Sequence, residues 1–277
     1  VVSNAEWGIC GPRQRLVAKF NPIHTVIRYK YLYTLDILSK LKLNKTVNKT
    51  RFVAYISLFA ALDVVLGALP ALPMISWAAF MKPFEGIALG SLGGPIAALI
   101  GGIVGMLLFP AAAGLGLYTF STGVIGAAVA GLLVDERVKI AAALMVIPLL
   151  AFLANPLGRE IAVPALYDQV IALILIYPAY LMVKKAKANQ KYLPLALFLV
   201  AFIGTEADNL TGNALFIDLH LYSVLYGLPA SSLYDLYLGG AFIYPIGRVL
   251  VGIANAIVGA PALIALKKAN LLSWPLT

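Results

Sequence analysis

The chain has 277 residues, of which 61% are hydrophobic and only 12% are charged, and its formal net charge is +9. Soluble domains are about 45–50% apolar and about 25% charged, so the charge here is too sparse to cover a water-facing surface. This composition argues against a soluble enzyme, a disordered tail and a nucleic-acid-binding module. Several apolar runs approach the ~20 residues that cross a ~30 Å hydrocarbon layer as helix. The sequence therefore predicts a polytopic integral membrane protein.

Residues 1–51 form a basic leader, and residues 52–277 form the predicted transmembrane helical domain. Ten of the 21 Lys and Arg residues precede residue 52, and clusters of this kind mark cytoplasmic segments. A short apolar stripe between residues 31 and 41 is compatible with an interfacial helix and equally with a basic tail. The single cysteine, Cys10, excludes an intrachain disulfide.

Eight membrane spans are predicted. Proline disfavours helix in the residue before it, so Pro70 is expected to end the first span and Gly94-Pro95 to separate the second from the third. The seventh span begins near Leu193 and contains an unusually polar stretch. In chain order, the predicted spans cover residues 52–69, 73–92, 95–113, 116–134, 138–155, 165–183, from 193 onward, and 238–266.

The positions of the basic clusters favour eight spans. With eight spans starting inside, the loops at 135–139 and 184–191 and the end at Lys267 are all cytoplasmic, as the positive-inside rule requires. Treating residues 71–108 as one span would place the basic loop at 184–191 outside. We therefore expect an all-α transmembrane bundle of about six to eight spans, with eight favoured, in the cell membrane and with both termini cytoplasmic.

The polar stretch of the seventh span is the first candidate site. Glu206, Asn209 and Asn213 recur at i, i+3 and i+7, which places them on one helical face, whereas Asp208 lies about 200° around the helix from Glu206. A charge near the bilayer centre costs roughly 2.5–3.5 kcal/mol on insertion scales, so it usually faces a cavity or a partner. We expect a hydrogen-bonding wall for a polar solute; the alternative is that residues 205–213 lie at the outer surface and are hydrated.

The last span carries a second polar stripe. Tyr244, Arg248 and Asn255 recur at i, i+4 and i+11, again on one face. Arg248 is expected either to pair with one of the two acids of the seventh span or to bind an anionic group of a substrate. Glu85, in the second span, is a further candidate for the wall of the site.

No enzyme signature is present. The sequence contains no HExxH, no GxSxG, no paired Asp motif that would hold Mg²⁺, and no P-loop Gly-Lys-Ser/Thr. It predicts no catalytic residue, no metal site, no cofactor and no ATPase of its own. Glycine pairs at four-residue spacing, such as Gly90 and Gly94, allow close approach of helices, for internal packing or, less favoured, for docking a partner membrane subunit.

Three segments resemble the substrate-binding S components of energy-coupling factor (ECF) vitamin transporters. Residues 54–66, after a basic leader, resemble the family's first helix, and residues 86–102 resemble its Gly-Pro break followed by small residues. Residues 244–250 and 254–257, with the end at 266–269, resemble its final helix. Ser57-x-x-x-Ala61 stands where the family often has Ala-x-x-x-Ala for docking the coupling subunit. S components usually have six helices, so residues 138–183 would be additional.

The resemblance implies a subunit that binds a vitamin or related micronutrient near its outer side and tips over in the membrane to release it. It implies as partners, besides membrane lipids, a transmembrane coupling subunit and two cytoplasmic ATPases, and no nucleic acid. Trp77 and Tyr118 could then stack on an aromatic substrate ring. The expected docking residues are Ser57, Ala61, Gly90 and Gly94, and the expected pocket residues are Glu85, Glu206, Asp208, Asn209, Asn213, Tyr244, Arg248 and Asn255.

Other functions remain open from the sequence. A self-sufficient secondary carrier would use Glu206 and Asp208 as proton-coupled sites. A membrane enzyme acting on a lipid or isoprenoid would need metal-binding carboxylates at the cytoplasmic rim. A structural or assembly subunit would bind no solute.

Overall fold

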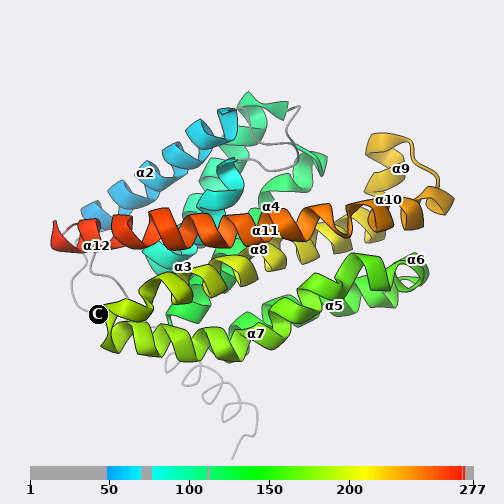
Figure 1. Ribbon diagram of the computed structural model, residues 1–277. Coiled ribbons are helices and arrows are strands. Elements are labelled where there is room, and N and C mark those ends of the chain that lie inside the picture. The colour runs from blue at the N-terminus through cyan, green and yellow to red at the C-terminus, as the bar shows by residue number, and fades with distance from the viewer. Residues whose placement is uncertain (1–48, 70–76, 111–112, 270, 272–277) are drawn as a thin grey trace, which may run out of the picture. The chain divides into compact units, whose positions relative to one another are not determined.

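A computed structural model describes residues 49–69, 77–110, 113–269 and 271. The leader at 1–48 lies outside these ranges, and so does the stripe at 31–41. Within them the chain is helical and has no strand (Figure 1), which confirms the all-α prediction. The helices are α2 (Lys49–Ala68), α3 (Trp77–Leu108), α4 (Thr119–Val134), α5 (Val138–Ala154), α6 (Pro156–Glu160), α7 (Ala162–Ala188), α8 (Leu193–Asp218), α9 (Leu221–Tyr226), α10 (Leu233–Gly240), α11 (Ile243–Ala254) and α12 (Ala260–Lys268).

Six helical segments in the described part of the chain are long and apolar enough to cross a membrane. They are α2, α3, α4 with the turn before it, α7, α8, and the series in which the π-helical residues Asn255–Gly259 join α11 to α12. α5 is apolar but shorter. The polytopic helical bundle predicted from hydropathy is therefore confirmed, within the expected range of about six to eight spans.

Helix α3 folds back on itself at Gly90, whose φ of 76° and ψ of −174° are not helical. Eight residues of straight helix span about 12 Å, yet a Cβ built on Gly94 would lie 2.5 Å from the Cα of Gly86. The predicted second and third spans are therefore two arms, residues 77–89 and 91–108, and the break falls at Gly90 rather than at Gly94-Pro95. Only glycine adopts this φ without strain. The Asp135 carboxylate accepts a 3.0 Å hydrogen bond from Ser91 N–H at the start of the second arm.

With both arms of α3 and the shorter α5 counted, the described chain passes along the bundle eight times. The turns at one end, here called the basic end, are held together by Lys187 Nζ and Glu136 Oε1 at 2.5 Å. At the opposite end, Asn155 Nδ2 donates to Asp218 Oδ1 at 3.1 Å. Figure 1 shows α6 and α9 at that opposite end, and the end of α12 at the basic end.

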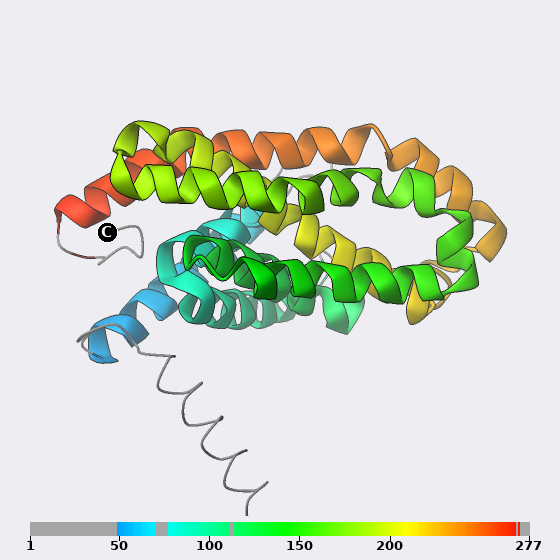
Figure 2. The ribbon, with the colours of Figure 1, turned by 90° about the horizontal axis from the view of Figure 1, so that it is seen from below.

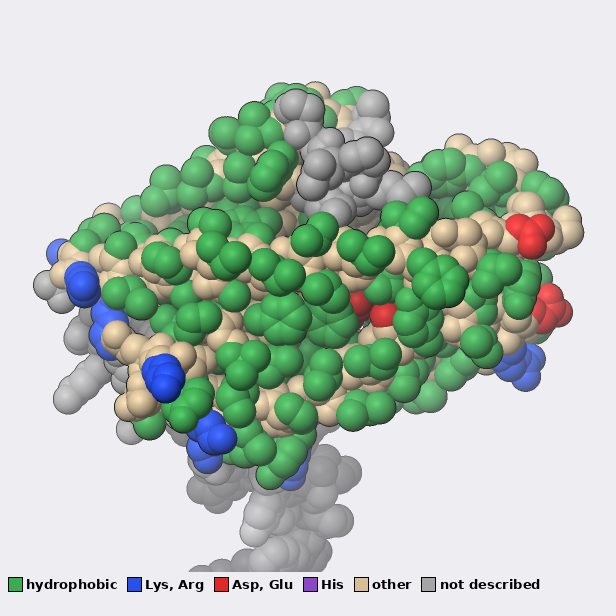
Figure 3. Space-filling model, viewed as in Figure 1, with side chains coloured by type: hydrophobic (Ala, Val, Ile, Leu, Met, Phe, Trp, Pro, Cys, Tyr) green, Lys and Arg blue, Asp and Glu red, His purple; other side chains and the backbone are tan. Residues whose placement is uncertain are grey.

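Helix α8 is the core of the bundle, because it packs against α3, α4, α5, α7 and α11. Figure 2 shows α5 and α7 running in roughly the same direction with a gap between them, in which α8 is seen, and α10 packs against α7. Small residues set the closest approach: Gly86 and Gly90 of α3 meet Gly131 of α4. Side chains on the outward faces are largely hydrophobic (Figure 3), as expected for surfaces in contact with lipid.

An ion pair joins α2 to the first arm of α3. The side chain of Asp63 is buried and pairs with Lys82. Gly101 makes room for it, since a Cβ at that position would collide with the Asp63 carboxylate. The pair is one reason why a lysine is tolerated within an apolar helix.

Candidate functional site

A cavity of about 440 Å³ lies between α7, α8 and the α10–α11 segment. Its helical walls come from the first turns of α7, the last turns of α8 and the start of α11, so it occupies the half of the bundle away from the basic end. Thr122 of α4 and the turn before α4 close another side. Figure 3 shows acidic side chains at the bottom of a hollow in the otherwise hydrophobic face between α7 and α11.

Five of the eight predicted pocket residues line this cavity. They are Asp208, Asn209, Asn213, Tyr244 and Arg248. Asn209 and Asn213 share a face of α8, as their spacing predicts. Asp208 lies on another side of α8, yet it lines the same cavity, because the cavity extends around α8 from α7 toward Thr122.

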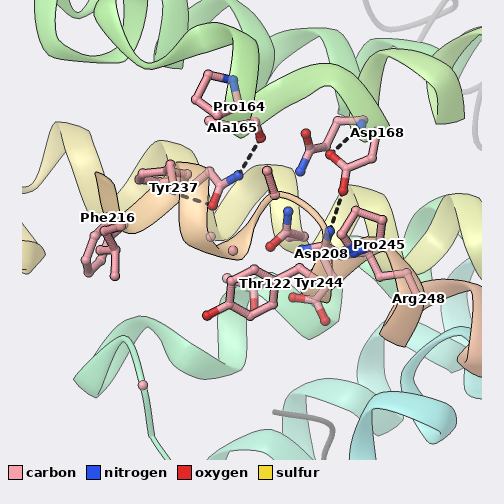
Figure 4. Close-up of a pocket in the computed structure, with 18 of the residues that line it drawn as sticks. Thr122, Pro164, Ala165, Asp168, Asp208, Phe216, Tyr237, Tyr244, Pro245 and Arg248 are labelled. Atoms are coloured by element: carbon pink, nitrogen blue, oxygen red, sulfur yellow. Dashed lines mark hydrogen bonds and ion pairs between the residues drawn. The ribbon is translucent and has the colours of Figure 1, made fainter. Parts of the chain in front are cut away.

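Arg248 is the centre of a buried charge cluster. Its Nη1 donates to Asp168 of α7, its Nε lies 3.5 Å from Glu206 Oε2, and its guanidinium carbon lies 5.6 Å from the centre of the Tyr244 ring. The sequence offered pairing with Glu206 or Asp208; the structure shows pairing with Glu206 and, unexpectedly, with Asp168. Figure 4 shows Asp168, Arg248 and Asp208 at one side of the cavity and Phe216 and Tyr237 at the other.

Both the nitrogen and the oxygen of the Asn213 side-chain amide form hydrogen bonds. Its Nδ2 donates to the Ala165 carbonyl at 3.2 Å, and its Oδ1 accepts from the Tyr237 hydroxyl at 3.4 Å. Burial, and to a smaller extent the neighbouring Tyr244, raises the pKa of the Tyr237 phenol above its usual value. This phenol stays neutral at physiological pH and acts as a donor, so it fixes the orientation of the Asn213 amide.

Three predicted residues lie outside the cavity. Glu206 has 0% exposure and sits behind Arg248. Asn255 donates to the carbonyls of Val251 and Phe80 at 3.0 and 3.3 Å, so it ties α11 to α3. Glu85 is also fully buried, and its carboxylate oxygens accept no hydrogen bond from any residue that the structure describes.

The remaining residues of the predicted site are the two aromatic residues expected to stack on a substrate and the four small residues expected to dock a partner. Trp77 and Tyr118 are both about half exposed and are not among the residues that line the cavity. Gly90 and Gly94 are both buried: Gly90 lies against Gly131 of α4, and Gly94 lies against Gly86 across the fold-back of α3. Ser57 and Ala61 are exposed on α2.

Two important residues were missed. Asp168 and Gln169, adjacent in α7, are both buried and both line the cavity. The signal that would have found them was present: an acid and an amide inside an apolar span, the same feature that singled out Glu206.

No protein-family model, no curated relative and no solved structure matches this chain.

Proposed function

We propose that this chain is the substrate-binding subunit of an ECF-type, ATP-driven importer and that it captures a vitamin or related small micronutrient. The observation that carries the proposal is the cavity, whose volume of about 440 Å³ is typical of a small-molecule site. Its charged groups converge from α7, α8 and α11, while much of the rest of its wall is apolar. Ionisable side chains within the membrane carry a free-energy cost, and binding of a polar solute is a function that would account for their presence.

The distribution of basic residues supports an orientation. Basic side chains concentrate at the basic end, whereas the opposite end has Arg159 together with acidic neighbours (Figure 3). By the positive-inside rule the basic end faces the cytoplasm. The cavity then lies in the outer half of the membrane, where a subunit that captures solutes from outside needs it. The residues that make up the basic end's positive charge are Arg51, Arg137, Lys139, Lys184, Lys185, Lys187, Lys191, Lys267 and Lys268.

The energy for import would come from partner subunits, because the sequence has no P-loop. Ser57 and Ala61 are four residues apart on one exposed face of α2. Small residues at that spacing give a flat surface on which another helix can pack closely. We assign to this face the docking of the transmembrane coupling subunit, with the ATPases bound on the cytoplasmic side.

The alternative is a self-sufficient secondary carrier. Glu206 and Glu85 favour it, since the oxygens of both buried carboxyls accept no hydrogen bond within the described part of the chain. Such carboxyls can serve as proton sites in carriers.

Reconstitution of the chain alone separates the two functions. Liposomes carrying the full chain are incubated with a defined mixture of water-soluble vitamins, with and without an imposed pH gradient, and the retained solute is counted by mass spectrometry. We expect about one solute molecule per chain, unchanged by the gradient, because binding needs no energy source and import needs the partners. Gradient-driven accumulation of many molecules per chain would instead establish the secondary carrier, and no retention at all would contradict both.

A further inference from the structure

The cavity contains more acid than base. Among the described residues that line it, Arg248 is the one basic side chain, against Asp168 and Asp208. The excess of acidic over basic side chains extends through the surrounding buried network, in which two basic residues face five acidic ones. The basic residues are Lys82 and Arg248, and the acidic residues are Asp63, Glu85, Asp168, Glu206 and Asp208.

Arg248 already has two acidic partners. Its Nη1 is bound to Asp168, its Nε faces Glu206 at 3.5 Å, and the Tyr244 ring lies against its guanidinium group. An anionic ligand at this guanidinium would compete with both buried acids for the same positive charge, and weakening either ion pair is costly. Lys82 of α3 is close enough to attract the Asp208 carboxylate electrostatically, but its ammonium group is already bound to Asp63.

Among the described residues that line the cavity, the one fully buried side-chain atom without a hydrogen-bond partner is an acceptor. Gln169 is 2% exposed and lines the cavity, and its Oε1 accepts no hydrogen bond from the residues that the structure describes. The Asp208 carboxylate lines the same cavity. The Asn213 amide, by contrast, is already hydrogen bonded through both its nitrogen and its oxygen. A complementary ligand therefore donates hydrogen bonds.

Aromatic rings complete the wall. Phe216, Tyr237 and Tyr244 all line the cavity, and the faces of such rings attract cations. From the acid excess, the engaged arginine, the vacant acceptors and these rings we infer that the ligand is an organic cation with N–H donors, such as a protonated amine or a charged heteroaromatic ring. This inference rests on the proposed function and narrows its substrate class.

Three probes of nearly identical shape test the charge preference. Benzamidinium is a cationic donor, benzamide is neutral and benzoate is anionic, and each is titrated into the purified full chain in detergent and followed by ligand-observed NMR. We expect benzamidinium to bind at least tenfold more tightly than benzamide, and benzoate to bind most weakly, because hydrogen bonds to ionised groups are about twice as strong as neutral ones.

Asp208→Asn removes the charge and keeps the shape. It should weaken benzamidinium binding at least tenfold and leave benzamide within threefold of wild type. Asp235→Asn is the matched control, since Asp235 is an exposed acid of α10, and it should change neither. The wild-type order of affinities decides the inference even if Asp208→Asn fails to fold.

The outcomes separate the inference from the proposed function. Benzoate binding as tightly as benzamidinium, or a cation preference that survives in Asp208→Asn, would overturn the inference and leave the binding subunit intact. Failure of all three probes to bind the folded wild-type chain would count against both.

Discussion

Gly86→Ala is expected to destabilise the folded chain by about 3 kcal/mol or more. A Cβ at this position would collide with the carbonyl oxygen of Ala127 and would lie 2.8 Å from the backbone nitrogen of Gly131. These are backbone atoms of α4, which cannot rotate away as a side chain can. The fold-back of α3 depends on the same contact, so we expect loss of the native bundle rather than local adjustment. Unfolding in detergent, followed by circular dichroism, measures the effect.

Gly105→Ala is the matched control for this prediction. Gly105 lies in the second arm of α3, and a Cβ there would meet no atom within 4 Å. Alanine is favoured over glycine in helices by up to ~1 kcal/mol, so this variant should be as stable as wild type or slightly more stable. A Gly86→Ala protein within 1 kcal/mol of wild type would show that the α3–α4 contact is not as close as the structure has it.

Arg248→Met is expected to cost about 3–5 kcal/mol, the range found when one partner of a buried ion pair is removed. Arg248 is 8% exposed, and its loss would leave Asp168 and Glu206 buried without a counter-charge. Methionine fills a similar volume, so the effect reports charge rather than packing. Chemical or thermal unfolding in detergent measures the loss of stability.

Two variants give this experiment its controls. Arg159→Met removes an exposed arginine of α6 and should change stability by less than ~0.5 kcal/mol. The triple variant Arg248→Met/Asp168→Asn/Glu206→Gln removes all three charges, and it should recover most of the loss, because no uncompensated charge stays buried. Recovery no better than the single variant would refute the electrostatic account of the cluster.

The sequence was sufficient to predict an all-α bundle of membrane-spanning helices, because the length of its apolar runs is a property of the sequence itself. It was not sufficient to place the reversal within α3. Several glycines and Pro95 were candidates, and the position is set by partners far along the chain: Asp135, which accepts from Ser91 N–H, and Gly131, which packs against Gly90.

The sequence correctly predicted the cavity residues whose position follows from helical spacing alone. It failed for residues whose position depends on how neighbouring helices pack. Asn209 and Asn213 reach the cavity because they share a face of α8 at its level. Glu206 shares that face but lies one turn deeper, where Arg248 covers it. Asn255 is nearly two turns beyond Arg248 and meets the Phe80 carbonyl instead. Asp168 could have been singled out as an acid inside an apolar span, but its arginine partner is 80 residues away.

The central claim is that the cavity between α7, α8 and α11 holds a small solute. Native mass spectrometry of the purified chain, after exposure to a mixture of water-soluble vitamins, tests it most directly. Gly212 lines the cavity, and a Cβ there would make only ordinary contacts, at 3.4 Å to Leu115 and 3.7 Å to Thr122. Gly212→Leu therefore fills the cavity while the chain folds. Gly239→Leu is its control, because Gly239 is exposed and a Cβ there would meet nothing within 4 Å.

We predict one solute molecule bound per wild-type chain, retained by Gly239→Leu and lost from Gly212→Leu. A wild-type chain that carries no solute, or a Gly212→Leu chain that carries the same solute as wild type, would contradict the assignment of this cavity as the binding site.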